Sequence, residues 1–298
     1  MSEPIQKHDR TYEIHEVSAL TGLEPARLRA WERRYSAVRP TRLANRYRVY
    51  SAEQVALLRA FARLIAEGAR IGALVDLSPN EVLERAEATS LEGSPLGPLV
   101  TAIRALDRVS LQERVKRLVA ELGRGRFSEE IVLPLSQLVG DLWAVGRLTI
   151  ASEHMATEVV LGALKQQLQL TSGIEPVVLA ACLEGEQHEW GVLATLAQLC
   201  ERGWRAHYLG PDLPLREVIE AAWTVQPACV ALTSSAADNL ASRLSELRRF
   251  RSKLPPGTMM LIGGEGIRPH ARHLREAGFR MDVSALPDPA SLRFPVGS

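Results

Sequence analysis

Two side chains in the stretch from Gly185 to Gly191 have types and a spacing that suit metal binding. His188 carries an imidazole, a common metal ligand in its neutral form, and Glu186 lies two residues before it. A carboxylate at that distance could accept the N–H of the other ring nitrogen and so fix the tautomer. A single histidine in a loop is more often a surface residue with no such role, so both interpretations stay open at this point.

A cluster of positive charge lies near the N-terminus. From Glu24 to Tyr50 the acidic residues are Glu24 and Glu32, against eight arginines, Arg27, Arg29, Arg33, Arg34, Arg39, Arg42, Arg46 and Arg48. Such a local excess is expected of a surface that contacts phosphates. From charge alone, the alternative is a solvated basic face on an ordinary helical domain.

The composition limits the class of protein. The chain has 298 residues, enough for two or three domains, with 46% hydrophobic and 24% charged residues. No run approaches the ~20 apolar residues of a membrane span and no secretory leader is present, which predicts a cytoplasmic protein with no membrane partner. Cys182, Cys200 and Cys229 lie singly among apolar neighbours, so we expect small buried residues rather than disulfides or metal ligands.

The basic cluster falls in a segment, about residues 8–76, with the pattern of a winged helix-turn-helix; we call this segment the reader. Apolar residues at helical spacing predict a first helix from Ile14, and Pro25 can begin a second helix with most of the arginines on one face. Alternation over 46–50 predicts a hairpin strand, and a Ser51–Gln54 capping box predicts a third helix over 52–66.

Three further segments follow the reader. Residues 77–94 contain several Pro and Gly residues and are predicted to be a linker, with room for a short helix over 80–88. Residues 95–172 carry long helical patterns with few breakers, which indicates a four-helix bundle. Residues 175–298 alternate short apolar runs, near 177–180, 206–209, 229–232 and 259–262, with amphipathic helices. That alternation predicts a parallel, Rossmann-like sheet covered on both faces. The fold class expected is therefore multidomain, α and α/β.

The string from Leu28 to Tyr35 (LRAWERRY), followed by Arg46-Tyr47-Arg48-Val49-Tyr50, closely resembles the DNA-binding domain of the MerR family of transcriptional regulators. The resemblance covers about residues 11–75 and implies dimeric binding to a palindromic double-stranded operator. The residues it implies at the DNA are Arg27, Arg29, Arg33, Arg34, Tyr35, Arg46, Tyr47 and Arg48. Most relatives place a dimerisation helix directly after this domain, whereas here a linker is predicted, so self-association would depend on the C-terminal part or on DNA.

The pattern Glu186-x-His188-x-x-Gly191 resembles the cobalamin-binding motif of the corrinoid domains in methionine synthase and base-off mutases, although those usually have aspartate at the position of Glu186. The resemblance implies that His188 ligates the cobalt of a cobalamin. It implies further that Glu186 orients the imidazole ring.

Two more loops match the same motif. Thr233-Ser234 and Gly263-Gly264 follow the third and fourth predicted strands, at the sheet edge where ligands bind in open parallel sheets. The resemblance implies that the glycines let the nucleotide tail of the cofactor pass close to the backbone, and that Thr233 or Ser234 bonds its benzimidazole nitrogen.

In the bundle, Trp143 followed by Glu153-His154 resembles a pattern in the light-responsive, cobalamin-binding repressors of the MerR family. The resemblance implies that Trp143 shields the upper axial group of adenosylcobalamin and that Glu153 and His154 contact it. Light-sensing members have a histidine where this chain has Ala144, and alanine cannot coordinate a metal. The similarity therefore supports cobalamin binding more strongly than photoreception. Without it, Trp143 would be interpreted as a core residue and Glu153-His154 as an exposed pair.

The sequence thus predicts a non-enzymatic repressor that forms a dimer or tetramer and is controlled by cobalamin bound through His188. Two alternatives stay open. One is a regulator with a vestigial corrinoid site or a protein antagonist. The other is a corrinoid methyl-transfer enzyme or carrier, against which the arginine-rich reader argues.

Overall fold

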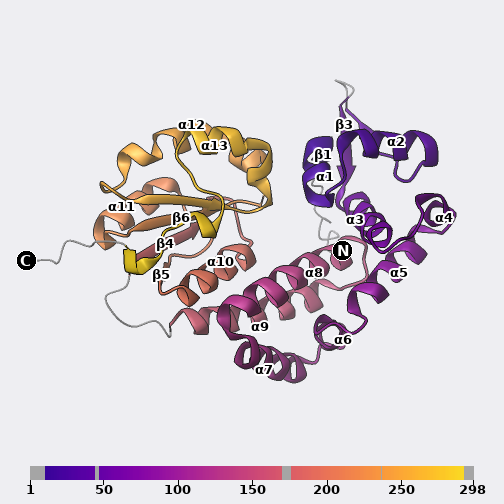
Figure 1. The fold of residues 1–298 in the computed structure, drawn as a ribbon, viewed down its shortest axis with the longest axis horizontal. Coiled ribbons are helices and arrows are strands. Elements are labelled where there is room, and N and C mark those ends of the chain that lie inside the picture. The colour runs from indigo at the N-terminus through magenta and orange to yellow at the C-terminus, as the bar shows by residue number, and fades with distance from the viewer. Residues whose placement is uncertain (1–10, 44–46, 170–175, 236, 292–298) are drawn as a thin grey trace, which may run out of the picture. The chain divides into compact units, whose positions relative to one another are not determined.

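The computed structural model describes residues 11–43, 47–169, 176–235 and 237–291 (Figure 1). The chain divides into two compact units. The first comprises residues 1–107 and 137–155, and the second comprises residues 108–136 and 156–298. Each unit is described by itself below.

The first unit begins with the reader. Its helices are α1 (Ile14–Thr21), α2 (Pro25–Tyr35) and α3 (Ala52–Ala66). Its strands β1 (Thr11–Glu13), β2 (Thr41–Arg42) and β3 (Arg48–Ser51) form an antiparallel sheet in the order β1-β3-β2. The predicted helices, the hairpin strand and the capping box at Ser51 are confirmed. The sequence did not predict β1, which pairs with β3 from Thr11↔Ser51 to Glu13↔Val49.

The core of the reader fixes the direction of α2. Leu28 and Trp31 are buried on one side of this helix, and the Trp31 ring meets Phe61 of α3 edge-on, with ring centroids 6.2 Å apart. Pro25 occupies the first turn of α2, where its missing N–H costs nothing. The arginines on the opposite side of α2 are therefore directed outward.

The segment expected to be a linker, 77–94, contains a helix. After α4 (Ile71–Val75), α5 spans Pro79–Leu91 and packs on α3. The Ser78–Glu81 capping box starts α5, and Val82 and Ala86 are buried in the same core as the reader. The Pro and Gly residues of the segment flank this helix instead of interrupting it.

The predicted bundle segment contains α6 (Leu96–Arg104), α7 (Arg108–Phe127), a π-helical turn η1 (Ser128–Val132), α8 (Leu133–Ala144) and α9 (Ile150–Leu168). The division between the two units falls within α8 and α9. In the first unit, Asp141 of α8 pairs with Arg59 of α3 at 2.7 Å. Both side chains are less than one-fifth exposed. This ion pair ties the reader to the part of α8 that carries Trp143.

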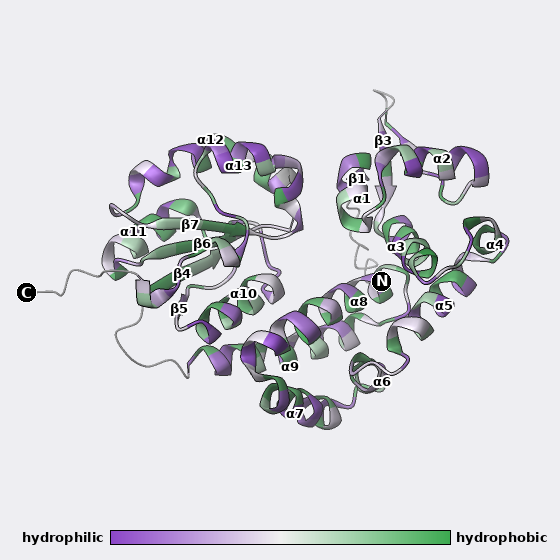
Figure 2. Ribbon diagram, viewed as in Figure 1, coloured by the Kyte–Doolittle hydropathy of each residue, from purple (hydrophilic) through white to green (hydrophobic). Residues whose placement is uncertain are grey.

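The second unit contains a four-stranded parallel sheet in the order β5-β4-β6-β7. Its strands are β4 (Val177–Cys182), β5 (Arg205–Tyr208), β6 (Cys229–Thr233) and β7 (Met259–Gly263), as the apolar runs predicted. Every residue of the central strands β4 and β6 is buried, and these strands are mostly hydrophobic (Figure 2), whereas the edge strand β5 alternates between exposed and half-buried residues. A sheet covered by helices on both faces requires such central strands.

Helices cover both faces of the sheet. On one face, α11 (Leu215–Val225), α12 (Ala237–Phe250) and α13 (Ala271–Glu276) share a single buried core with the strands. α10 (Trp190–Glu201) packs on β4 and β5 and also contacts α7. The remaining turns are η2 (Arg251–Lys253), η3 (Glu265–His270), η4 (Val283–Ala285) and η5 (Pro289–Ser291).

The structure also bears on the expectations about the cysteines and about membrane-spanning helices. Cys182, Cys200 and Cys229 are free thiols and buried, as their apolar neighbours predicted. Among the described residues, none of the helices combines the length and the apolar character that a membrane crossing requires.

Candidate functional site

Three loops meet at the carboxyl edge of the parallel sheet, where β4, β6 and β7 end side by side. Leu183 N–H donates to the Thr233 carbonyl at 3.1 Å, and Ser234 N–H donates to the Gly263 carbonyl at 3.1 Å. The Glu186–His188 pair follows β4 in the first of these loops. The structure therefore brings together the three sequence segments that carry the resemblance to corrinoid domains.

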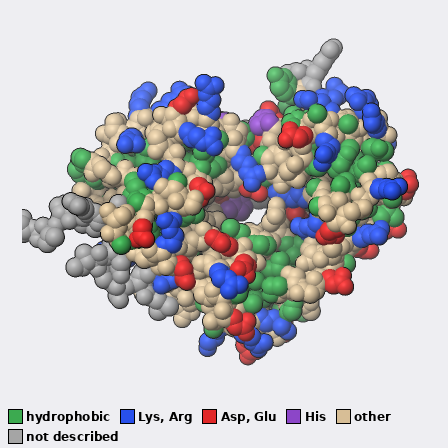
Figure 3. All heavy atoms as spheres, in the orientation of Figure 1, with side chains coloured by type: hydrophobic (Ala, Val, Ile, Leu, Met, Phe, Trp, Pro, Cys, Tyr) green, Lys and Arg blue, Asp and Glu red, His purple; other side chains and the backbone are tan. Residues whose placement is uncertain are grey.

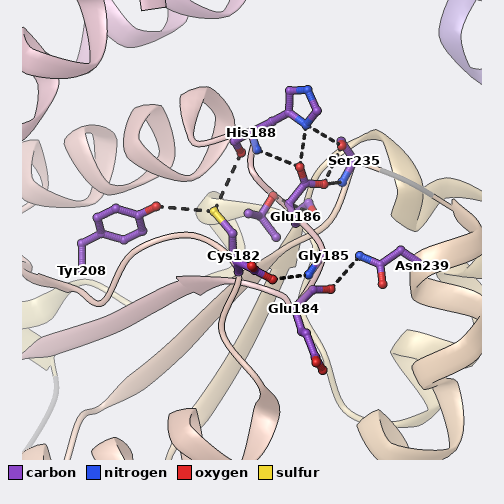
Figure 4. Close-up of polar contacts among 11 residues, drawn as sticks. Cys182, Glu184, Gly185, Glu186, His188, Tyr208, Ser235 and Asn239 are labelled. Carbon is purple, nitrogen blue, oxygen red and sulfur yellow. Dashed lines mark hydrogen bonds and ion pairs between the residues drawn. The ribbon is translucent and has the colours of Figure 1, made fainter. Parts of the chain in front are cut away.

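At this edge of the sheet, the Glu186 carboxylate contacts both the backbone N–H and the imidazole ring of His188 (Figure 4). Glu186 Oε1 accepts a hydrogen bond from His188 N–H at 2.8 Å and lies 2.6 Å from His188 Nδ1. The carboxylate is 2% exposed, whereas the imidazole is 67% exposed. A carboxylate can only accept, so the proton belongs on Nδ1 and the ring lone pair on Nε2, which points away from Glu186.

Ser235 completes this arrangement, and the sequence analysis did not identify it. Both its backbone N–H and its hydroxyl donate to Glu186 Oε2, the oxygen that His188 does not use. The signal was available, because Ser235 directly follows the predicted pair Thr233-Ser234 at the end of β6. Ser235 thus fixes the carboxylate that in turn fixes the imidazole.

The electrostatic state of Glu186 follows from these contacts. Burial alone would raise the pKa of its carboxyl group, but the hydrogen bonds from His188 and Ser235 outweigh burial and lower the pKa to about 2. Because the pKa of Glu186 is lower in the folded protein, its ionised carboxylate stabilises the fold at pH values above the ordinary pKa of 4.5. That contribution is lost as the pH falls toward 2.

A second set of contacts anchors the residues just after His188. Glu189 accepts from the Tyr208 hydroxyl at 2.8 Å and pairs with Lys165 of α9 at 3.0 Å. Trp190 Nε1–H donates to the Thr157 hydroxyl of α9 at 3.2 Å. The loop is therefore held on one side by the sheet and on the other by α9.

Cys182 lies beneath this loop. Its thiol is 3.4 Å from the Tyr208 hydroxyl, and burial raises the pKa of the thiol to about 12. The sulfur is therefore uncharged at neutral pH, so the metal-ligand candidate at this edge is the imidazole.

The other cofactor residues predicted from the sequence lie around the same edge. Thr233 and Ser234 are buried. Gly264 has φ +98°, and a Cβ there would lie 2.2 Å from the Ser234 carbonyl oxygen, so this position requires glycine. Gly263 has open space where a side chain would start. Gly191 lies in the first turn of α10, again with space beside it.

The predicted upper-face residues belong to the first unit. Trp143 is half-buried near the end of α8, and Glu153 and His154 lie in the first turns of α9. Glu153 Oε2 lies 2.5 Å from His154 Nδ1, and the His154 side chain is 73% exposed. Residue 144, next to Trp143, is an alanine with no group that could bind a metal.

The predicted DNA-contacting residues lie on the outside of the reader. The exposed members come from α2 and from the wing, the β2–β3 hairpin: Arg27, Arg29, Arg33, Arg34, Tyr35 and Tyr47. Arg46 lies outside the described residues. The exposed arginines of α2 form a helix face that could enter a major groove.

Arg48 differs from the other arginines because it is engaged inside the reader. Its Nε–H donates to Glu32 of α2 at 2.9 Å, and Glu32 also accepts from the hydroxyl of the fully buried Tyr50. Burial, and then the hydrogen bond to Glu32, raises the pKa of Tyr50. Glu32, which the sequence analysis counted only as a charge, therefore joins α2 to wing strand β3.

Two segments of the chain match models of known protein families. Residues 12–80 match the model for the MerR HTH family regulatory protein, and residues 97–166 match the model for a B12 binding domain. Together with the winged reader and the parallel sheet, these matches define a MerR-type DNA-binding regulator with a B12-binding domain.

Similarity to individual proteins identifies the family within this class of regulators. The HTH-type transcriptional repressor CarH of Myxococcus xanthus is 30% identical over 274 residues, which cover 88% of this chain and 91% of CarH. The repressor CarA of the same organism is 31% identical over 276 residues, 90% of this chain and 91% of CarA. The regulator MlrA of Escherichia coli K12 is 33% identical over 70 residues, 24% of this chain and 29% of MlrA. The chain belongs to the family of HTH-type transcriptional repressors that includes CarH and CarA.

The contacts of Arg33 and Arg48 predict different effects of their removal. Arg33→Ala should weaken operator binding and lower the salt slope by about 1, because one exposed phosphate contact is lost, while thermal stability stays unchanged. Arg48→Ala should also destabilise the reader, by about 1–3 kcal/mol, because the carboxylate of Glu32 loses a partner. DNA titrations at several salt concentrations and thermal unfolding measure both effects. Equal stability losses in the two variants would contradict the structural role of Arg48.

The contacts of Glu186 predict that replacing its carboxylate by an amide weakens cobalamin binding. Glu186→Gln removes the charge and replaces one accepting oxygen by a donor, so either Ser235 or His188 loses its acceptor. We expect cobalamin affinity to fall by about 10–100-fold, the usual effect of losing a residue that orients a ligand. Glu184→Gln, two residues earlier at an exposed carboxylate paired with Arg243, is the matched control and should bind as the wild type does. Absorbance titrations with cobalamin compare the affinities of the two variants. Equal affinities would show that Glu186 does not orient the His188 imidazole.

Proposed function

We propose that this protein is a transcriptional repressor whose operator binding is controlled by a cobalamin ligated through Nε2 of His188. The observation that carries the proposal is the hydrogen bond between Glu186 and His188 Nδ1, because it leaves the exposed imidazole with its lone pair on Nε2. Membership of the repressor family supports the DNA-binding part.

The residues at the carboxyl edge of the sheet fit a cobalamin in chemistry as well as position. When bound, cobalamin supplies a cobalt ion that accepts nitrogen ligands. His188 would ligate it, and Glu186 with Ser235 would hold the imidazole ring. The open space at Gly263, beside the buried hydroxyls of Thr233 and Ser234, would suit the nucleotide tail.

Adenosylcobalamin is the form that we propose, on the basis of Trp143, Glu153 and His154. In this proposal the indole of Trp143 would shield the adenosyl group, and Glu153 with His154 would contact it. These three residues belong to the unit that contains the reader.

Control of DNA binding would then follow from linkage. Cobalamin can act on operator affinity only to the extent that it binds the alternative assembly states differently. A dimer or tetramer that places several readers on one operator gains affinity through effective concentration, without any new contact to the bases. The ion pair of Arg59 with Asp141 would transmit a change at Trp143 to the reader, because both partners are largely buried in the same unit.

The chemistry of residue 144 argues against the light response that the resemblance implies. Ala144 has no side chain that could ligate cobalt, whereas light-sensing members of the family have a histidine there. Control by a protein antagonist is the alternative to control by light.

Loading with adenosylcobalamin in darkness provides the test. Operator affinity should differ at least tenfold, about 1.4 kcal/mol, between the loaded and cobalamin-free protein. His188→Ala should abolish that difference without changing the affinity of the cobalamin-free protein. His207→Ala, an exposed histidine on β5, is the control and should behave as the wild type does. A cobalt-linked absorbance spectrum unchanged in His188→Ala, or equal operator affinities in the loaded and free wild type, would refute the proposal.

A further inference from the structure

A second concentration of positive charge lies in the sheet-containing unit. From Arg248 to Arg275 the chain has one acidic residue, Glu265, against seven basic residues, Arg248, Arg249, Arg251, Lys253, Arg268, Arg272 and Arg275. The excess of six positive charges equals that of the reader, which has eight arginines and two glutamates between Glu24 and Tyr50. The whole chain has a net charge of only +1, so these two segments stand out from the rest.

The fold brings these residues onto neighbouring elements. The end of α12 meets the segment just after α13, where the Phe250 and Phe279 rings stack with centroids 6.2 Å apart. Arg251 lies directly against Gly278, where a Cβ would be 2.8 Å from its Nη1. Figure 3 shows Lys and Arg side chains over the α12 and α13 region. We call Arg248, Arg249, Arg251, Lys253, Arg272 and Arg275 the α12–α13 basic surface.

The charges of this surface are available to a partner. All six side chains are exposed. Arg272 pairs with Glu276 on the same helix, while the guanidinium groups of Arg248, Arg249 and Arg275 form no ion pair among the residues that the structure describes. A helix surface that only needed solubility would carry charges of both signs interspersed.

The surface is separate from the cofactor site. Because α12 connects the carboxyl end of β6 to the amino end of β7, its last turn lies at the sheet edge opposite to the loop of His188. Within 248–275 there are no exposed large hydrophobic side chains among the described residues, and at this surface the neighbouring one is Trp223 of α11, whose Nε1–H donates to the Lys253 carbonyl at 2.8 Å. An apolar docking site or a membrane-inserting surface would need a contiguous group of such side chains here.

We propose that the α12–α13 basic surface binds the phosphate backbone of duplex DNA outside the stretch that the reader contacts. Exposed arginine and lysine side chains suit a contact with the phosphate backbone, which needs no base recognition. Duplex DNA is the partner that charge complementarity favours, because the chain belongs to a DNA-binding family and operator binding keeps this unit tethered near a duplex. The inference rests on operator binding by the reader.

The test compares two duplexes and two triple variants. One duplex contains the operator alone, and the other adds flanks of about two helical turns, ~21 base pairs, on each side. Arg248→Gln/Arg249→Gln/Arg275→Gln removes three exposed charges from the surface. Arg114→Gln/Lys116→Gln/Arg117→Gln removes three exposed charges from α7 in the same unit and serves as the control with equal net charge.

The wild-type full-length protein should bind the flanked duplex at least tenfold more tightly than the operator alone. Its salt slope on the flanked duplex should be steeper by about 2–3, since each neutralised phosphate contributes about 0.9. The surface variant should lose this gain, and the α7 control should keep it. Equal affinities of the wild type for both duplexes, or equal losses in both variants, would overturn the proposal. Failure of operator binding by the reader, on which the inference rests, is distinguishable, because it would remove binding to the short operator itself.

Discussion

The hydrogen bond between Glu186 and His188 Nδ1 is the interaction on which the rest of this account depends. An unrestrained imidazole in a loop can rotate and exchange tautomers, and it then offers a metal no fixed lone pair. Here a carboxylate that is almost fully buried selects the tautomer and the ring orientation, and Ser235 keeps that carboxylate in place. The lowered pKa of Glu186 is the electrostatic consequence of the same contacts.

The structure supports that interaction from both sides of the loop. The carboxyl edge of the sheet supplies Ser235, while α9 supplies Lys165 and Thr157, which hold the two residues after His188. Arg59 and Asp141 make a comparable link in the other unit, between the reader and α8. Within each unit, side-chain contacts therefore hold the predicted cofactor residues to the elements next to them, and a ligand changes an assembly equilibrium only through its differential affinity for the two states.

Local sequence patterns predicted most of the elements, because each was marked by a physical signal of its own. Uninterrupted apolar runs marked the four parallel strands, and capping residues marked α3. Strand β1 was missed because a three-residue edge strand has no period to detect. Glu32 and Ser235 were missed for a different reason. Their roles depend on partners 16 and 49 residues away, and only the folded chain specifies such pairs.

Electron paramagnetic resonance of the protein loaded with cobalamin and reduced to the Co(II) state tests the central claim most directly. The unpaired electron of Co(II) couples to the nucleus of its lower axial nitrogen, so isotopic labelling of histidine identifies that atom. With ¹⁵N-labelled histidine and unlabelled cobalamin, ligation by His188 predicts that the nitrogen triplet splitting becomes a doublet, and that His188→Ala abolishes the change. A triplet that persists in the labelled protein would assign the lower ligand to the cofactor's own benzimidazole and would contradict the account.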